Sequence, residues 1–323
     1  MKNFFRFEAA CLLALLAFPQ IVFAQAYPAK PIRVVNGYAA GGPNDNIARP
    51  ITQHLSEVFG HQVIVDNRPG ANGNIGADEV VRSAPDGYTL LFATTSQVTI
   101  NPALYSMPFD VQRDLAPIVQ ISMNSSAIVL HAAVPPSSVK ELIAYMRANP
   151  GKVSFASAGN SSINHLAGEL LAMITKTQLL HVPFKGGGPA LTDVVAGRVD
   201  MMIISAPTTL PFVRAGKLKV LAVSSTKRLS VLPDVPTVEE AGIPDFQVQA
   251  GTGLLAPAKT PRPIIARMNA ETVKFLTSTE GRSKLGTQGV EIVAGTPEDF
   301  AQTIRSETAR WAAVVKAGNI KLE

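Results

Sequence analysis

Apolar positions in the first third of the chain alternate between strand-like and helix-like patterns. Ile32–Val35 is a β-rich run, and the next segment carries Ile47, Ile51, Leu55 and Val58 at spacings of four, four and three. Those spacings place the four side chains on one face of a helix. Two further strands and a second helix follow, over 63–65, 88–93 and 75–83. Three strands alternating with two helices predict a βαβαβ unit, in which the strands are parallel by default.

Polar residues and a proline set the shape predicted for the first helix. Asn44 or Asp45 can cap its first turn, because both side chains accept hydrogen bonds from free backbone N–H groups. Pro50 removes one helical hydrogen bond, which predicts a kink or a shortened helix.

A second series of strands and helices occupies the rest of the chain. Ser138 can cap a helix that runs to Ala148, Pro189 suits a helix start, and Gly197 suits a helix end. The other elements of the middle region are strands over 118–121, 153–155, 201–204 and 218–223 and a helix over 165–174. A strand over 253–256 and helices over 263–276 and 297–316 complete the pattern.

This succession predicts an α/β protein of two lobes, each a mostly parallel sheet flanked by helices. The first lobe is expected to comprise residues 25–123 and 250–323, and the second lobe residues 124–249. If the C-terminal elements return to the first lobe, two strands cross between the lobes and form a hinge.

Residues 1–24 have the pattern of a cleaved signal peptide. Lys2 and Arg6 precede an apolar stretch over 12–18, and small residues favour cleavage after Ala24, with Ala26 as the alternative. The apolar stretch is shorter than the roughly 20 residues that a membrane-spanning helix needs. A periplasmic location is therefore expected.

Composition excludes several classes of function. Cys11 is the only cysteine and lies before the apolar stretch, so the mature chain has no thiol for disulfides, catalysis or metal binding. Removing Lys2, Arg6 and Glu8 from 29 basic and 24 acidic residues leaves 27 and 23, a net charge near +4. Without a lysine or arginine block, and with 6% aromatic residues, the chain does not have the pattern of a nucleic-acid-binding protein.

Four glycine-containing segments each lie between a strand-like and a helix-like run, over 38–45, 67–74, 157–164 and 184–189. Glycine lets the backbone turn and approach a guest closely, and the free N–H groups of the following helix favour an anion. These segments predict a crevice that binds a small carboxylate. No nucleophile elbow and no metal-ligand spacing is present, so neither catalysis nor a cofactor is expected.

Several ordered motifs resemble the Bug family of periplasmic solute-binding proteins of the tripartite tricarboxylate transporter type. They include Ala40-Gly-Gly-Pro-Asn-Asp45, Asn67-Arg-Pro-Gly70, Ser83-Ala-Pro-Asp-Gly-Tyr88, His165-Leu-Ala-Gly-Glu169 and the run from His181 to Asp200. The resemblance covers the whole predicted mature chain. The chain departs from it at Ala39-Ala40, where many relatives carry proline.

The resemblance implies a Venus-flytrap of two lobes that closes on an organic anion. Main-chain amides, hydroxyls and two ordered waters would hold a carboxylate, and a membrane transporter of the tripartite tricarboxylate type would be the partner of a monomer. The candidate ligand-binding residues of the first lobe are Tyr38, Ala40, Gly41, Gly42, Asn44, Asp45, Asn72, Gly73, Asn74, Thr94 and Ser96. Those of the second lobe are Ser157, Asn160, Ser161, His165, Lys185, Gly186, Gly187, Gly188, Ser205 and Thr208.

Several of these side chains also have a structural interpretation. Asp45 and Arg49 are four apart, so a helix-surface ion pair competes with a ligand contact. Arg68 suits loop stabilisation, and His165 and His181 suit hydrogen bonding or packing.

Two other functions stay open at this stage, a ligand-sensing accessory protein for a membrane sensor kinase and a secreted hydrolase. The residues do not distinguish dicarboxylates, tricarboxylates, aromatic acids and amino acids as ligands.

Overall fold

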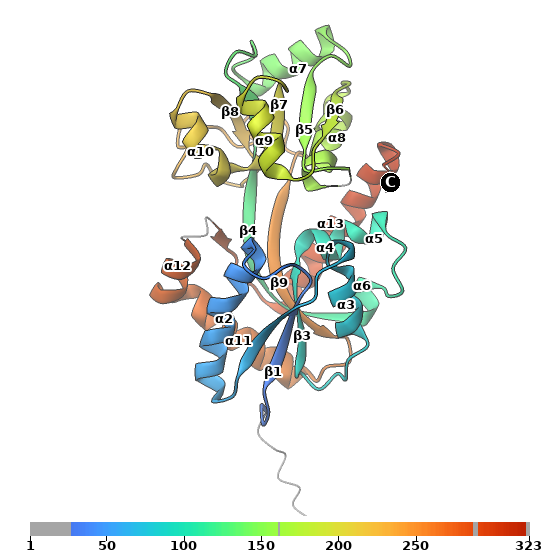
Figure 1. Cartoon of the computed structure of the whole chain (residues 1–323), viewed down its shortest axis with the longest axis vertical. Coiled ribbons are helices and arrows are strands. Elements are labelled where there is room, and N and C mark those ends of the chain that lie inside the picture. The colour runs from blue at the N-terminus through green and yellow to red at the C-terminus, as the bar shows by residue number, and fades with distance from the viewer. Residues whose placement is uncertain (1–26, 161, 287–289, 321–323) are drawn as a thin grey trace, which may run out of the picture.

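Two α/β lobes are joined by a pair of long strands in the computed structural model, which describes residues 27–160, 162–286 and 290–320 (Figure 1). The strands are β4 (Leu115–His131) and β9 (Gln249–Pro257), and they pair antiparallel from Leu115 opposite Pro257 to Ser125 opposite Gln249. The pair lies between the two lobes, so two strands do cross from one lobe to the other (Figure 1). Within the described residues, no helix combines the length and apolarity that a membrane crossing requires.

The first lobe contains the predicted βαβαβ unit. Strands β1 (Ile32–Asn36), β2 (Val63–Asn67) and β3 (Thr89–Thr94) are parallel, in the order β2-β1-β3, and β9 extends the sheet antiparallel to β3. The connecting helices are α2 (Pro43–Phe59) and α3 (Asn74–Val81).

Helix α2 differs in detail from its sequence prediction. Ile47, Ile51 and Leu55 are buried, but Val58 is 40% exposed and Phe59 fills the last core position. The N-cap residue is Gly42. The predicted capping by Asn44 or Asp45 is therefore wrong, because both already lie inside the first turn. The helix also continues past Pro50 and has a total length of 17 residues, because burial of its apolar face outweighs one missing hydrogen bond.

The second lobe contains a sheet with both parallel and antiparallel pairs. β5 (Ser154–Ser157) pairs parallel with β6 (Leu180–Pro183) and with β7 (Met201–Ser205), while β7 and β8 (Leu218–Val223) each pair antiparallel with β4. Its helices are α7 (Val139–Ala148), α8 (Ile163–Thr175), α9 (Gly187–Val195) and α10 (Ala206–Arg214). The predicted cap of α7 by Ser138 is confirmed, because its side chain accepts a hydrogen bond from the Glu141 N–H.

Short elements complete the described chain. They are η2 (Ala71–Gly73), α4 (Thr95–Thr99), α5 (Asn101–Leu104), α6 (Val111–Asp114), α12 (Thr279–Gly286) and β10 (Glu291–Ile292). Most of them are too short to show a helical or alternating apolar pattern, and sequence periodicity did not predict them.

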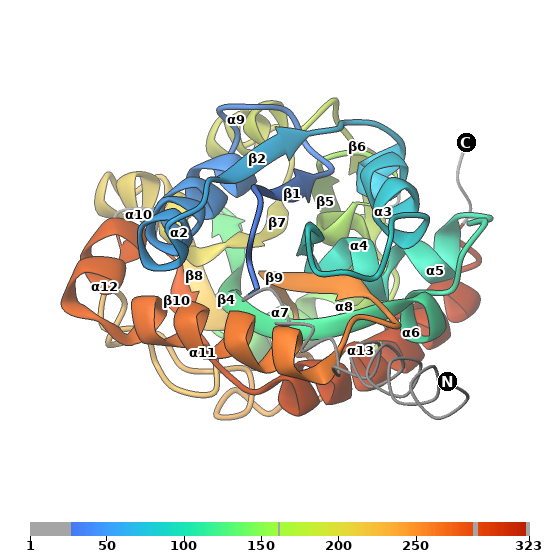
Figure 2. The ribbon, with the colours of Figure 1, turned by 90° about the horizontal axis from the view of Figure 1, so that it is seen from below.

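Two long C-terminal helices, α11 (Arg262–Thr277) and α13 (Pro297–Ala317), lie along the crossing strands (Figure 2). Phe300 near the start of α13 belongs to an apolar cluster of the first lobe. Trp311 and Val314 near its end pack in the same cluster as Leu166 and Leu170 of α8. Helix α13 therefore contacts the apolar cores of both lobes.

Candidate ligand-binding site

A cavity of about 300 Å³ lies between the lobes, beside the crossing strands. Its walls come from both lobes and from the start of β9. The lining residues are Tyr38, Asn44, Ile47, Asn72, Thr94, Ser96, Ile100, Asn124, Ala158, Ser162, Ile163, Asn164, Ala250, Gly251 and Thr252.

The described lining mixes polar and apolar residues and contains no lysine, arginine, histidine, aspartate or glutamate. Four asparagines supply amide groups, and the tyrosine, threonines and serines supply hydroxyls. Three isoleucines supply apolar surface. Such a cavity can bind a charged group through neutral hydrogen-bond donors only.

Helix N-termini from both lobes meet at this cavity. Asn44 lies in the first turn of α2, and Ser162 and Ile163 form the N-cap and first residue of α8. Thr94 caps α4 by accepting a hydrogen bond of 3.1 Å from the Gln97 N–H. Because the first N–H groups of a helix have no partner within it and carry the positive end of its dipole, this arrangement favours an anion.

Hydrogen bonds between neutral groups fix the first-lobe wall. The Tyr38 hydroxyl lies 3.0 Å from Thr94 Oγ1 and 3.3 Å from the Asn72 carbonyl oxygen. Asn72 adopts a left-handed conformation, with φ of 52°, and its amide nitrogen donates to Asn101 Oδ1 at 2.9 Å. Burial raises the pKa of Tyr38. Its hydroxyl therefore stays protonated at neutral pH, and its one proton is available to the Asn72 carbonyl oxygen, which fixes the ring in this wall.

Asp45 is occupied by structural contacts. Its carboxylate is buried and accepts hydrogen bonds from Gly41 N, Arg49 Nε and Asn67 Nδ2, at 2.9, 2.7 and 3.1 Å. Burial opposes ionisation, but the hydrogen bonds from Arg49, Gly41 and Asn67 hold the pKa of Asp45 below its ordinary value. The predicted Asp45–Arg49 ion pair is present, and it fixes the loop that precedes α2.

Five of the predicted site residues line the cavity, namely Tyr38, Asn44, Asn72, Thr94 and Ser96. Ser161 lies outside the described residues. The others lie outside this lining and are Ala40, Gly41, Gly42, Asp45, Gly73, Asn74, Ser157, Asn160, His165, Lys185, Gly186, Gly187, Gly188, Ser205 and Thr208. Their role as ligand contacts stays a prediction.

Physical reasons explain why some predicted side chains are not in the lining. The Gly73 carbonyl accepts a hydrogen bond from Gln97 Nε2, and Asn74 Oδ1 accepts one from Asn101. Lys185 is exposed, and a β-carbon added at Gly187 or Gly188 would meet nothing within 4 Å. The start of α9 thus faces open space in this structure.

Sequence reasoning missed the contribution of the crossing strands. Asn124 of β4 and Ala250, Gly251 and Thr252 of β9 line the cavity, and Asn124 Oδ1 is buried without a partner among the described residues. The available signal was the polar run over 122–126 within an otherwise apolar strand.

Other lining residues lay close to predicted ones. Ser162, Ile163 and Asn164 belong to the third glycine-containing segment, but none of them was a candidate ligand contact.

Three aromatic rings stack behind the second-lobe loop. The rings of His165 and His181 are parallel with centroids 3.8 Å apart, and Phe155 stacks on His181 at 4.9 Å. Ser157 Oγ lies 2.7 Å from His181 Nε2 and also accepts a hydrogen bond from the Gly159 N–H. The structural interpretation of both histidines is thus supported by their packing.

Because His181 is partly buried in this stack, we predict that the folded protein loses stability in acid. Burial, and then the neighbouring His165, lower the pKa of His181 from 6.5 to about 4. The unfolded chain therefore binds more protons below pH 6.5, and stability falls as the pH drops from about 6.5 towards 4. Partial exposure reduces the effect to on the order of 1 kcal/mol.

Urea unfolding between pH 7.5 and 5 measures this effect. His181→Gln should flatten the pH dependence, whereas His61→Gln, between α2 and β2, should retain the wild-type slope. Equal slopes for both variants would contradict the assignment to His181.

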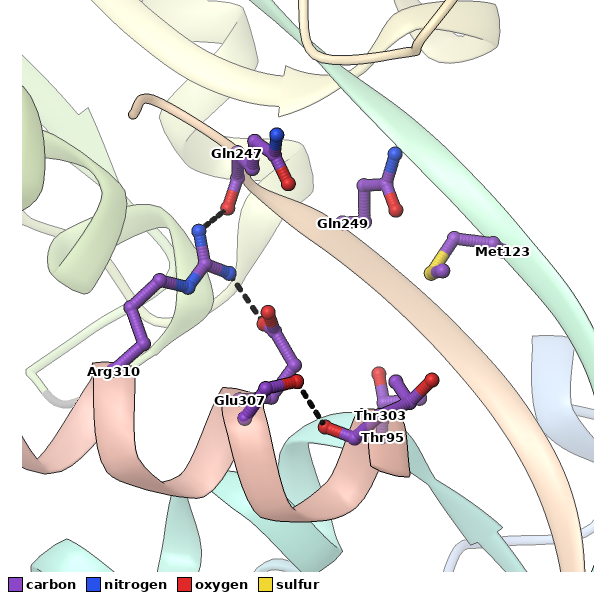
Figure 3. Close-up of a pocket in the computed structure, with 8 residues that line it drawn as sticks. Thr95, Met123, Gln247, Gln249, Thr303, Glu307 and Arg310 are labelled. Atoms are coloured by element: carbon purple, nitrogen blue, oxygen red, sulfur yellow. Dashed lines mark hydrogen bonds and ion pairs between the residues drawn. The ribbon is translucent and has the colours of Figure 1, made fainter. Parts of the chain in front are cut away.

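A second cavity, of about 190 Å³, lies between the crossing strands and helix α13 (Figure 3). Met123 and Gln249 come from β4 and β9, and Glu307 and Arg310 come from α13. Arg310 donates hydrogen bonds to Glu307 and to the Gln247 carbonyl oxygen. Because this guanidinium already has an internal carboxylate partner, the uncharged cavity is the stronger candidate for anion binding.

Comparison with known proteins identifies the family. The model of the tripartite tricarboxylate transporter family receptor matches residues 47–320. The chain belongs to this family. Protein BugT of Bordetella pertussis is 35% identical over 304 residues, which cover 94% of this chain and 93% of BugT. The resemblance to the Bug family is thereby confirmed.

Solved structures of other receptors are similar over most of the chain. Rpa4515 of R. palustris with adipate is 33% identical, with a TM-score of 0.75 over 91% of this chain and 99% of its own. MatC (Rpa3494) from Rhodopseudomonas palustris with bound malate is also 33% identical, with a TM-score of 0.72 over 90% and 100%. The family is one of transporter receptors, and the similar structures also include a periplasmic binding protein, BugD, and a TctC solute-binding protein from Polaromonas. These are binding proteins and not enzymes, which removes the hydrolase alternative and supports a periplasmic location. The predicted signal peptide lies outside the described residues.

Proposed function

We propose that the protein captures a small organic carboxylate between its lobes and delivers it to a membrane transporter of the tripartite tricarboxylate type. The single observation that carries the proposal is a cavity whose described lining offers amide and hydroxyl groups but no charged side chain, bordered by helix N-termini of both lobes. The adipate in Rpa4515 and the malate in MatC support a carboxylate as the ligand class.

Neutral donors can supply the affinity that such a receptor needs. Each hydrogen bond to a charged group contributes about 1.5–3 kcal/mol. Five or six of them can exceed the cost of immobilising a small anion and leave about −8 kcal/mol, a micromolar dissociation constant. Backbone amides, side-chain hydroxyls and ordered waters together provide that number of donors without an arginine.

Closure of the lobes would report occupancy to the transporter. Because first-lobe and second-lobe groups line one cavity, a ligand that contacts both binds the closed form more tightly and shifts the population towards it. In this proposal residues 25–123 and 250–323 form one moving unit and residues 124–249 the other. The mature protein, cleaved after Ala24, acts as a monomer.

A thermal-shift screen of organic acids tests the binding function. At least one carboxylate should raise the melting temperature, because a ligand that binds only the folded state stabilises it. A screen in which no organic acid has this effect would refute the proposal.

Gly187 at the start of α9 provides a test of the second-lobe contacts. Gly187→Val should weaken binding of that carboxylate by at least about tenfold, since the branched side chain blocks approach to backbone amides. The melting temperature of the apo protein should stay nearly constant, because a β-carbon there meets nothing within 4 Å.

Gly286→Val is the matched control for this variant. Gly286 likewise has free space around an added β-carbon, but it lies in α12, on the first lobe. Calorimetric titration should give wild-type affinity for the control. Unchanged affinity in Gly187→Val would remove the start of α9 from the site.

A further inference from the structure

Three isoleucines give the cavity an apolar wall. Ile47 comes from α2 in the first lobe, Ile100 from the junction of α4 and α5, and Ile163 from the first turn of α8 in the second lobe. Ile47 and Ile100 belong to different apolar clusters, and Ile163 packs against the cluster that contains Ile100. Apolar surface therefore reaches the ligand space from both lobes.

The lack of an acidic side chain in the described lining excludes ligands with an amine. Among the described lining residues there is no carboxylate to pair with an ammonium group. Asp45 is the acidic side chain nearest in sequence to the lining residue Asn44, and its oxygens are already occupied by Gly41, Arg49 and Asn67. An amino acid would therefore lose the hydration of its ammonium group without gaining an ionic partner.

The same lining disfavours ligands of high negative charge. Three carboxylates on one small molecule repel one another, and the described lining residues include no lysine, arginine or histidine to offset that repulsion. A ligand hydroxyl that faces the three isoleucines would lose hydrogen bonds to water, whereas a methylene group there would not.

The volume of the cavity limits the size of the ligand. A space of about 300 Å³ is at the lower end of small-molecule sites. Liquid water would fill it with about ten molecules. A ligand of roughly ten non-hydrogen atoms, the size of adipate or benzoate, matches this volume.

We infer that the ligand is a mono- or dicarboxylate with an unsubstituted aliphatic or aromatic body, and that the three isoleucines select it. This inference rests on the proposed function and narrows it to one substrate class. The carboxylate binds at the helix N-termini, while the apolar body contacts Ile47, Ile100 and Ile163. Each methylene that leaves water strengthens binding by about fourfold.

Calorimetric titration with adipate, benzoate, malate, citrate and glutamate tests the inference. Adipate or benzoate should bind at least about tenfold more tightly than malate, citrate and glutamate. If malate, citrate or glutamate binds most tightly, the substrate class is wrong while the receptor function stands. If no member of this panel or of the wider acid screen binds, the proposed function itself fails.

Ile163→Thr separates apolar selection from general binding. Threonine keeps the branched shape at this partly buried position but replaces a CH₂CH₃ group by a hydroxyl. The preference for adipate or benzoate over malate should fall by about five- to tenfold. Val231→Thr, at a half-exposed position outside the cavity, is the matched control and should keep the wild-type preference.

Folding of both variants is verified by thermal melting. A melting temperature near that of the wild type with an unchanged ligand preference in Ile163→Thr would overturn the role of this residue. If Ile163→Thr does not fold, Ile100→Val makes the same measurement with a smaller expected change of about twofold to fourfold.

Discussion

Asn44→Asp should abolish most of the carboxylate binding and leave the fold as stable as before. The change adds one negative charge to the lining at nearly constant shape. At an effective dielectric constant of about 20, two unit charges about 4 Å apart repel by about 4 kcal/mol, so a loss of at least about a hundredfold in affinity is expected. In the apo protein the new carboxylate lies in the first turn of α2, where the helix dipole stabilises it by about 0.3–1 kcal/mol.

Asn46→Asp is the matched control. It makes the same substitution in the same helical turn, but Asn46 is exposed and does not line the cavity. Calorimetric titration should give affinity within about threefold of the wild type. If both variants bind equally well, the α2 N-terminus does not contact the anion, and if Asn44→Asp unfolds at a lower temperature than Asn46→Asp, the helix-dipole argument is wrong.

Gly251→Ala should destabilise the protein by about 3 kcal/mol or more. A β-carbon at this position of β9 would lie 2.2 Å from the Ser122 carbonyl oxygen of β4, a backbone atom that cannot rotate away. The Gly251 N–H also donates to Thr95 Oγ1 at 2.8 Å, which fixes the strand in place. Moving β9 would disturb both the crossing strands and the cavity, so ligand affinity should fall as well.

Urea unfolding of Gly251→Ala beside Gly286→Ala measures the effect. Gly286 has free space around its added β-carbon and lies at the end of a helix, where alanine is favoured. The control should therefore match the wild type or exceed it slightly. A free energy of unfolding for Gly251→Ala within about 0.5 kcal/mol of the wild type would contradict the close strand packing.

Local periodicity was enough to predict most of the longer elements within each lobe. The βαβαβ unit, the cap at Ser138 and both long C-terminal helices follow from apolar spacing, prolines and capping residues. The ends of α2 did not follow, because Val58 and Phe59 are both apolar and only tertiary packing decides which one is buried.

The crossing strands show that local sequence periodicity does not predict pairing between distant segments. Ser122–Ser126 is nearly all polar, yet it continues β4 because it pairs with β9, which is more than 100 residues away in sequence. For the same reason Asn124 and Gly251 were absent from the predicted site. The glycine-containing segments, in contrast, identified the first-lobe wall, because turns and helix starts are encoded locally.

A crystal structure with the dicarboxylate or aromatic acid that most raises the melting temperature tests the central claim most directly. We predict one carboxylate in the cavity between the lobes, within hydrogen-bond distance of backbone N–H and hydroxyl groups at the starts of α2 or α8 and without a lysine or arginine partner. A carboxylate paired with a cationic side chain, or bound in the cavity beside Arg310, would contradict the account.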